Sequence, residues 1–214
     1  MPDRRRMPDR RRMPDQRPSE GSTRPPRQTR SVVLILAVGS FITAVSLGVR
    51  STMGLFLDPI SDGLALGTST FGLTVALQNL VWGLGQPLAG AIADRFGTVR
   101  VLLSGAVLYV CGLFVLADAS SAAQLHIGGG LLMGLGLAAA SFSVVLAAIG
   151  RLVPAERRGF ALGLVTAFGS VGQFVLIPVM QRVIDGAGWR TALVVLAVIV
   201  TSLGLAVRPL RASA

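Results

Sequence analysis

The sequence predicts an all-α membrane protein with six transmembrane helices, and three observations support this fold class. First, 52% of the 214 residues are apolar and only 14% are charged, which is too apolar for a soluble domain of this size. Second, the chain contains six apolar segments long enough to cross a bilayer, which takes about 20 helical residues. Third, glycine and alanine recur inside these segments, and small residues let membrane helices approach closely.

The six segments follow one another with short polar links between them. β-Strands are excluded at these lengths, because a barrel strand needs only about 10 residues and alternates polar with apolar side chains. We therefore expect one six-helix domain over residues 31–214. The predicted helices cover residues 32–57, 71–93, 99–116, 123–149, 160–184 and 191–207.

Residues 1–30 form a basic tail that repeats the unit MPDRRR and carries half of the arginines in a chain without lysine. The tail has several prolines and almost no apolar residues, so we expect it to be disordered. Beside a membrane segment, such a tail favours contact with anionic membrane lipid on the cytoplasmic side over binding to nucleic acid. We therefore expect no nucleic-acid partner.

Arginine is distributed unevenly between the two sets of links. The tail, the link between the second and third segments, the link between the fourth and fifth, and the C-terminus carry most arginines. The opposite links hold only Arg182 and Arg190, together with several aspartates. Because cytoplasmic loops are enriched in basic residues, this pattern predicts a protein of the cell (inner) membrane with both termini cytoplasmic.

The link GAIADRFGTVRV, residues 90–101, is unusually charged for a connection between two apolar segments. Arg95 and Arg100 anchor it on the cytoplasmic side, while Gly90 and Gly97 permit a tight turn. Asp94 needs a hydrogen-bonded or charged partner, because an unpaired carboxylate near a membrane is costly.

These residues resemble the signature Gly-x-Leu-x-Asp-Arg-x-Gly-Arg-Arg of the major facilitator superfamily, which lies between helices 2 and 3. Gly90, Asp94, Arg95 and Gly97 match, whereas Thr98 and Val99 stand where the signature has basic residues and Arg100 follows just after them. The resemblance implies a role for this link in gating. The alternative is an anchoring turn with no part in transport.

A second resemblance narrows the group to the monocarboxylate/oxalate porter branch. The stretch GVRSTMGLFLDPI is similar to helix 1 of that branch, with its basic residue and serine at Arg50 and Ser51. The stretch ERRGFALGLVTAFGSVGQFVLIPV looks like its helix 5 signature; the matching residues are Arg157, Arg158, Ala161, Gly163, Ala167, Gly169, Ser170, Gly172 and Pro178.

The resemblance implies the amino-terminal half of a major facilitator fold, built as a 3+3 inverted repeat. Such a half contributes to alternating-access transport of a small organic anion such as a monocarboxylate, with proton coupling as an option and no cofactor. We expect the chain to associate with itself or with a partner that carries the second six-helix half. A truncated remnant or a non-transporting subunit is the alternative.

Arg50 is the main candidate for substrate binding, because a guanidinium inside a membrane helix is costly unless it faces a cavity or a partner. Its planar fork suits bidentate binding of a carboxylate. The alternative is snorkelling to the outer interface, since a long apolar run, residues 32–49, precedes it.

Polar residues on two other helices are further candidates for the binding site. The second segment carries Gln78, Asn79, Trp82 and Gln86, of which three share one helix face; they could line a cavity or bond across helices. Ser170 and Gln173 of the fifth segment are weaker candidates.

Enzymatic and metal sites have no support in the sequence. His126 and Ser170 lack the Gly-x-Ser-x-Gly elbow of a serine hydrolase, and one histidine with one cysteine forms no metal-ligand set. We therefore expect no catalytic residues and no metal.

Overall fold

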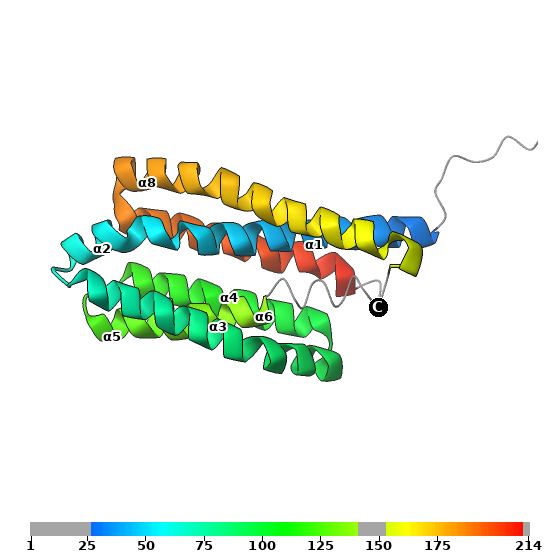
Figure 1. The fold of residues 1–214 in the computed structure, drawn as a ribbon, viewed down its shortest axis with the longest axis horizontal. Helices are drawn as coiled ribbons and strands as arrows, with labels where there is room; N and C mark the ends of the chain where they lie inside the picture. The colour runs from blue at the N-terminus through cyan, green and yellow to red at the C-terminus, as the bar shows by residue number, and fades with distance from the viewer. Residues whose placement is uncertain (1–26, 141–152, 212–214) are drawn as a thin grey trace, which may run out of the picture.

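The structure, a computed structural model, describes residues 27–140 and 153–211, and every element assigned in these ranges is helical (Figure 1). The predicted disordered tail falls largely outside this part of the chain, as does the end of the predicted segment 123–149. The elements are α1 (Arg27–Ser51), the 3-10 helix η1 (Thr52–Phe56), α2 (Leu57–Gly63), α3 (Thr68–Phe96), α4 (Thr98–Ala117), α5 (Ala122–Leu125), the π-helix η2 (His126–Leu132), α6 (Met133–Ala139) and α8 (Ala155–Arg211).

The predicted boundary between tail and helical domain is shifted in the structure. α1 begins at Arg27, slightly before residue 30, where we expected the tail to end. α1, η1 and α2 then follow one another directly, so the first predicted segment continues to Gly63.

α8 contains the last two predicted segments, joined at a bend. Gly188 has φ 81° and ψ 161°, a conformation that is open only to glycine, and this residue interrupts the helix. We call residues 155–187 the first limb and residues 189–211 the second limb. The two limbs run in opposite directions along the bundle (Figure 1).

The helices lie lengthwise beside one another (Figure 1). α1 packs mainly on α8, while α4 contacts both α8 and α6, and α3 packs on α6 and η2. One end of the bundle collects the start of α1, the α3–α4 turn and both ends of α8; the other end collects the α2–α3 connection and the bend at Gly188. This arrangement places the arginine-bearing links at one end, as the sequence predicts.

Among the described residues, four helical stretches are long and apolar enough to cross a membrane: Leu36–Gly63, Thr98–Ala117, Ala122–Ala139 and Ala155–Gly204. The last of them includes the bend at Gly188 and so covers two predicted segments. α3 has 29 residues and a length of about 43 Å at 1.5 Å per residue, yet it is not among the four. Its amides and glycines lower its hydropathy, so six spans and the 3+3 repeat remain predictions.

Small residues bring helix backbones into contact at several crossings. A Cβ at Gly172 of α8 would overlap the carbonyl oxygen of Ala44 in α1. A Cβ at Gly136 of α6 would lie 2.6 Å from the backbone nitrogen of Tyr109 in α4. The prediction that glycine permits close helix packing is confirmed at these crossings.

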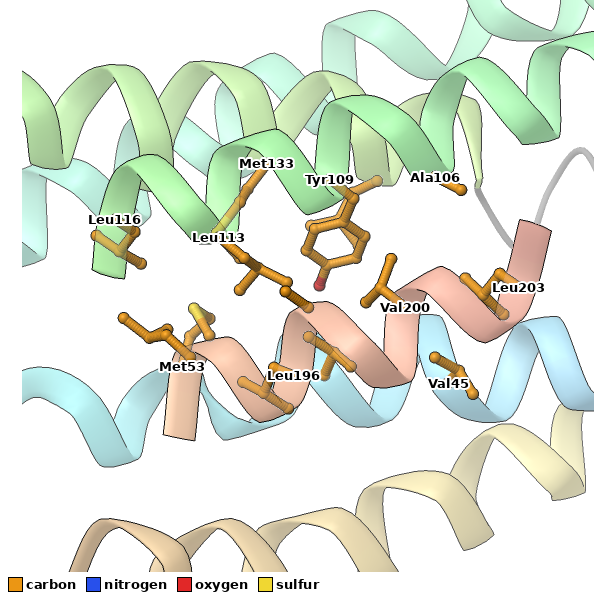
Figure 2. Close-up of a cluster of buried hydrophobic side chains, with 14 of the residues drawn as sticks. Val45, Met53, Ala106, Tyr109, Leu113, Leu116, Met133, Leu196, Val200 and Leu203 are labelled. Carbon is orange, nitrogen blue, oxygen red and sulfur yellow. The ribbon is translucent and has the colours of Figure 1, made fainter. Parts of the chain in front are cut away.

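The apolar core lies between α1, α4, α6 and the second limb of α8 (Figure 2). The second limb occupies the centre of this cluster and buries Leu196 and Val200 completely. The labelled core residues are Val45, Met53, Ala106, Tyr109, Leu113, Leu116, Met133, Leu196, Val200 and Leu203.

Candidate functional site

Arg50 lies in the last turn of α1 and reaches across to α3. Its Nη2 donates a hydrogen bond of 2.8 Å to Oδ1 of Asn79. The amide nitrogen of Asn79 donates to the carbonyl of Val75, one turn earlier, at 2.9 Å. Because the amide nitrogen is used within α3, the amide oxygen is directed at the guanidinium.

Trp82 forms the second contact of Arg50 with α3. The guanidinium carbon lies 4.5 Å from the centre of the indole ring, in cation–π geometry. Such a contact contributes about 0.5–2 kcal/mol, more where water is excluded. Asn79 and Trp82 lie three positions apart on α3 and together hold the side chain of Arg50 at a fixed place.

The charge of Arg50 has an amide rather than a carboxylate as its hydrogen-bond partner. All acidic side chains of the described residues are exposed and lie at helix ends or connections. The Nε atom of Arg50 is buried and has no hydrogen-bond partner within the described ranges. Leaving such a donor unpaired costs about 1–3 kcal/mol, so the site favours an anionic acceptor.

Tyr109 of α4 is fully buried in the apolar core, and sequence reasoning did not identify it. Its ring points from α4 toward α1 and the second limb of α8 (Figure 2). The hydroxyl lacks a partner among the described residues. The only sequence signal is that this is the sole tyrosine of the chain and lies in an apolar segment.

Gln78 bonds between helices and does not contact Arg50 in the structure. Its Nε2 donates to the carbonyl of Gly129 at 3.0 Å, and its side chain is buried. The acceptor belongs to the π-helix η2, where widened turns leave carbonyls available. One turn earlier, Thr74 Oγ1 lies 2.9 Å from Nδ1 of His126. Of the two alternatives for Gln78, the interhelical bond is the one observed.

The remaining candidates lie further along α3 and on α8. Gln86 is half-buried one turn beyond Trp82 on α3. On α8, Ser170 is exposed and Gln173 is half-buried, close to where Gly172 meets Ala44 of α1. On α8, Leu176 packs against Gly48 of α1. The structure thus brings Arg50 together with Asn79 and Trp82.

The α3–α4 link is a turn of one residue, Gly97, with φ 94°. Arg100 donates to the carbonyl of Phe96 at 3.5 Å, and the guanidinium of Arg95 lies 5.4 Å from the ring of Phe96. Asp94 is exposed and has an interaction partner. The expected role of Gly97 is confirmed.

The expectation for Gly90 was wrong, because this glycine lies inside α3 and contributes nothing to the turn. A Cβ there would meet no atom within 4 Å. Arg157 and Arg158 are exposed at the start of α8, at the same end of the bundle as the Gly97 turn.

A second arginine joins helices at the opposite end of the bundle. Arg190, at the start of the second limb of α8, donates to the carbonyls of Ala117 and Ala119 at 2.7 and 3.1 Å. Its guanidinium lies 4.4 Å from the centre of the Trp189 ring. Arg190 therefore supplies hydrogen-bond donors at the C-terminal end of α4, where the last carbonyls have no partner within the helix.

Comparison with known proteins agrees with this arrangement. The chain matches the Major Facilitator Superfamily over residues 36–213. It is 30% identical over 183 residues to monocarboxylate transporter 11 of Mus musculus, covering 84% of this chain and 40% of the relative. It is 31% identical over 173 residues to monocarboxylate transporter 12 of Xenopus laevis, covering 79% and 37%.

A bacterial relative is the probable sulfoacetate transporter SauU of Cupriavidus necator, 27% identical over 170 residues, covering 79% of this chain and 38% of the relative. The chain thus spans about two fifths of the length of these relatives, and its resemblance to the monocarboxylate branch is confirmed. The chain belongs to the major facilitator superfamily and is a multi-pass membrane protein.

Proposed function

We propose that this chain forms the amino-terminal half of a secondary transporter that moves a small organic anion by alternating access. The observation that carries the proposal is Arg50, a half-buried cation in a membrane helix whose hydrogen-bond partner is neutral. The names of the relatives denote carriers of monocarboxylates and of sulfoacetate, which are small organic anions. A bound anion would supply the opposite charge that the guanidinium of Arg50 does not receive from Asn79.

The contacts of Arg50 argue for binding rather than snorkelling. A snorkelling arginine extends its head to the aqueous interface. Arg50 is instead held on α3 by Asn79 and Trp82. A guanidinium fixed in this way loses little further freedom when it binds a carboxylate, and its remaining N–H groups suit a bidentate contact.

In a transporter of this kind, the substrate pathway lies between two repeats that rock against each other around a site near the bilayer midplane. We propose that the second half is supplied by the rest of the same protein, by a partner or by a second copy. The competing proposal is a non-transporting remnant or subunit. A stable 22 kDa monomer that catalyses uptake alone would contradict the need for a second half.

We also propose that both termini are cytoplasmic. The arginine-bearing ends of the helices share one end of the bundle, which supports this orientation (Figure 1). Reporter fusions at residue 65 and after residue 211 test it. We expect an outside signal from the first and an inside signal from the second, and the reverse pattern would contradict the proposal.

Uptake of labelled lactate and sulfoacetate into proteoliposomes tests the transport function. The wild-type chain is purified in mild detergent with whatever partner it retains. We expect Arg50→Ala to abolish uptake and Arg50→Lys to weaken it, with Arg182→Ala as the matched control, because Arg182 is exposed on α8. Full uptake by Arg50→Ala would contradict the role of Arg50.

A further inference from the structure

His126 and Thr74 connect the π-helix η2 to α3 through a hydrogen bond of 2.9 Å between Nδ1 and Oγ1. The hydroxyl of Thr74 also lies 3.0 Å from the carbonyl oxygen of Thr70, one turn earlier on α3, and donates its single hydrogen there. Towards His126, this hydroxyl can therefore only accept. It follows that Nδ1 of His126 carries a hydrogen, whatever the charge of the ring.

The second ring nitrogen of His126, Nε2, is the atom left to exchange a proton. Within the described ranges, the ring makes no hydrogen bond other than the one to Thr74. Nε2 is also not among the fully buried atoms without a partner, so it keeps some accessible surface. A neutral ring with its hydrogen on Nδ1 presents a lone pair at Nε2, and protonation there leaves the bond to Thr74 in place.

The position of His126 distinguishes it from a surface histidine. It is half-buried in the stretch Ala122–Ala139, which is long and apolar enough to cross a membrane. An ionisable side chain inside such a stretch is costly and typically marks an ion or proton pathway. His126 also begins a π-helix, whose widened turns are frequent at functional sites.

The surroundings of His126 leave Thr74 as the group that orients the ring. The elements packed against η2 are α3, α4, α5 and α6. Their ionisable side chains are Asp94, Arg95, Arg100, Tyr109 and Cys111. The first three lie around the Gly97 turn, at the opposite end of the bundle, and the last two lie in the middle of α4 (Figure 1). Asp118 follows the last residue of α4, and Arg190 is bonded there to backbone carbonyls. Within the described ranges, none of these groups is hydrogen-bonded to His126.

We propose that His126 binds the proton that accompanies the anion, with Thr74 fixing Nδ1–H and Nε2 gaining and losing the proton. Uptake of the proton forms one N–H bond and converts the imidazole into an imidazolium, and release to water reverses this step. The coupling role rests on the transport function proposed above, whereas the proton site does not. α3 connects the two sites: Thr74 bonds His126, and Asn79, about 7.5 Å further along the helix axis, bonds Arg50. A positive charge on His126 therefore lies beside the helix that also holds the anion-binding guanidinium, and it favours a bound anion.

Nuclear magnetic resonance tests the proton site directly. The chain has a single histidine, so nitrogen-15 labelling of histidine gives the signals of His126 alone. The full chain, purified in mild detergent through a tag without histidine, is studied by long-range proton–nitrogen correlation from about pH 5 to about pH 8.5. We expect the Nδ1–H form at the alkaline end and a doubly protonated ring at the acidic end. A ring with its hydrogen on Nε2 at the alkaline end, or a ring that stays neutral throughout, overturns the inference.

Substitutions of Thr74 test what fixes the ring. Thr74→Val keeps the shape but removes the acceptor, so the hydrogen should no longer be confined to Nδ1. Thr74→Ser keeps the hydroxyl and should keep the Nδ1–H form. Thr166→Val is the matched control, because Thr166 donates to the carbonyl of Leu162 within its own helix. An unchanged spectrum of Thr74→Val overturns the role of Thr74.

Uptake of labelled lactate into proteoliposomes, with and without an inward proton gradient, tests the coupling role. His126→Gln cannot bind a proton, yet its side-chain amide can still donate to Thr74. We expect the gradient to accelerate uptake by the wild type, and the variant to lose this acceleration while keeping uptake driven by lactate alone. Acceleration in His126→Gln, or none in the wild type, overturns the coupling role. A wild type without any uptake overturns it together with the proposed function, whereas a contrary spectrum beside normal uptake overturns the inference alone.

Discussion

Arg50 of α1 and Arg190 of α8 both form a cation–π contact with a tryptophan and donate hydrogen bonds to another helix, but their surroundings differ. Each guanidinium lies over a tryptophan, at 4.5 Å from Trp82 and 4.4 Å from Trp189. Arg190 donates from both Nη atoms to backbone carbonyls at the end of α4. Arg50 donates to one side-chain amide and keeps a buried Nε–H that has no partner in the part of the chain that the structure describes.

The difference separates a structural arginine from a binding one. Carbonyls that end a helix are acceptors which the fold must satisfy, so the hydrogen bonds of Arg190 stabilise the native state. Arg50 leaves donor capacity unused, which costs stability unless a ligand uses it. Substitutions at the two positions should therefore have opposite consequences for stability and for ligand binding.

The largest effect is expected at Arg50. Replacing Arg50 with alanine removes the cation that contacts Asn79 and Trp82, and we expect anion affinity to fall by at least about 100-fold, the lower range for truncating a buried charged contact. The melting temperature should stay the same or rise. Ligand titration and thermal unfolding of the same preparation measure both quantities. If Arg50→Ala bound the anion as tightly as the wild type, Arg50 would not be a binding residue and the proposed difference from Arg190 would be wrong.

The next effect is expected at Arg190. Alanine there removes two charge-assisted hydrogen bonds to α4, and we expect the free energy of unfolding to fall by about 3 kcal/mol. Anion affinity of the folded fraction should not change. Unfolding in mixed detergent measures the loss, with Arg182→Ala as the neutral control. A larger loss in Arg50→Ala than in Arg190→Ala would reverse the assignment.

A smaller effect is expected when the partner of Arg50 becomes charged. Asn79→Asp places a carboxylate 2.8 Å from Nη2, where it competes with an incoming anion. We expect anion affinity to drop about tenfold without loss of stability, since an opposite charge at this distance is favourable. Asn79→Ala serves as the comparison and should weaken binding less. Equal effects of the two variants would show that the charge of Arg50 is already neutralised.

The smallest effects are expected at the two tryptophans. Phenylalanine at either position keeps an aromatic face but weakens the cation–π contact by about 0.5–1 kcal/mol. Trp82→Phe should therefore lower anion affinity about threefold, whereas Trp189→Phe should lower only the stability. Uptake and thermal unfolding distinguish the two, and a loss of affinity in Trp189→Phe would contradict the separation of roles.

Local patterns in the sequence predicted much of the fold and one part of the site. Apolar segments predicted the helices, and Gly97 was predicted to permit a tight turn, where its φ is positive. The cost of a charge in a membrane helix predicted Arg50 as a candidate, whereas its grouping with Asn79 and Trp82 comes from the structure.

Other features depend on contacts between distant segments and could not be read from local patterns. The burial of Tyr109 in the core between helices is one such feature, which no spacing in the sequence reveals. Gln78 lies on the same face of α3 as Trp82, yet its side chain bonds to the carbonyl of Gly129, which belongs to the π-helix η2. The bonds of Arg190 join residues more than 70 positions apart.

The one-residue turn at Gly97 bears on how the chain enters the membrane. α3 is not apolar enough to be counted among the spanning helices, whereas α4 is, and only Gly97 separates them. During synthesis, a helix of low hydropathy inserts poorly by itself. Because the turn leaves no slack, α3 and α4 must partition into the lipid together as a helical hairpin, with the strongly apolar α4 drawing its polar neighbour in. Asn79 and Trp82, the α3 residues that hold Arg50, therefore depend on α4 for their insertion into the bilayer.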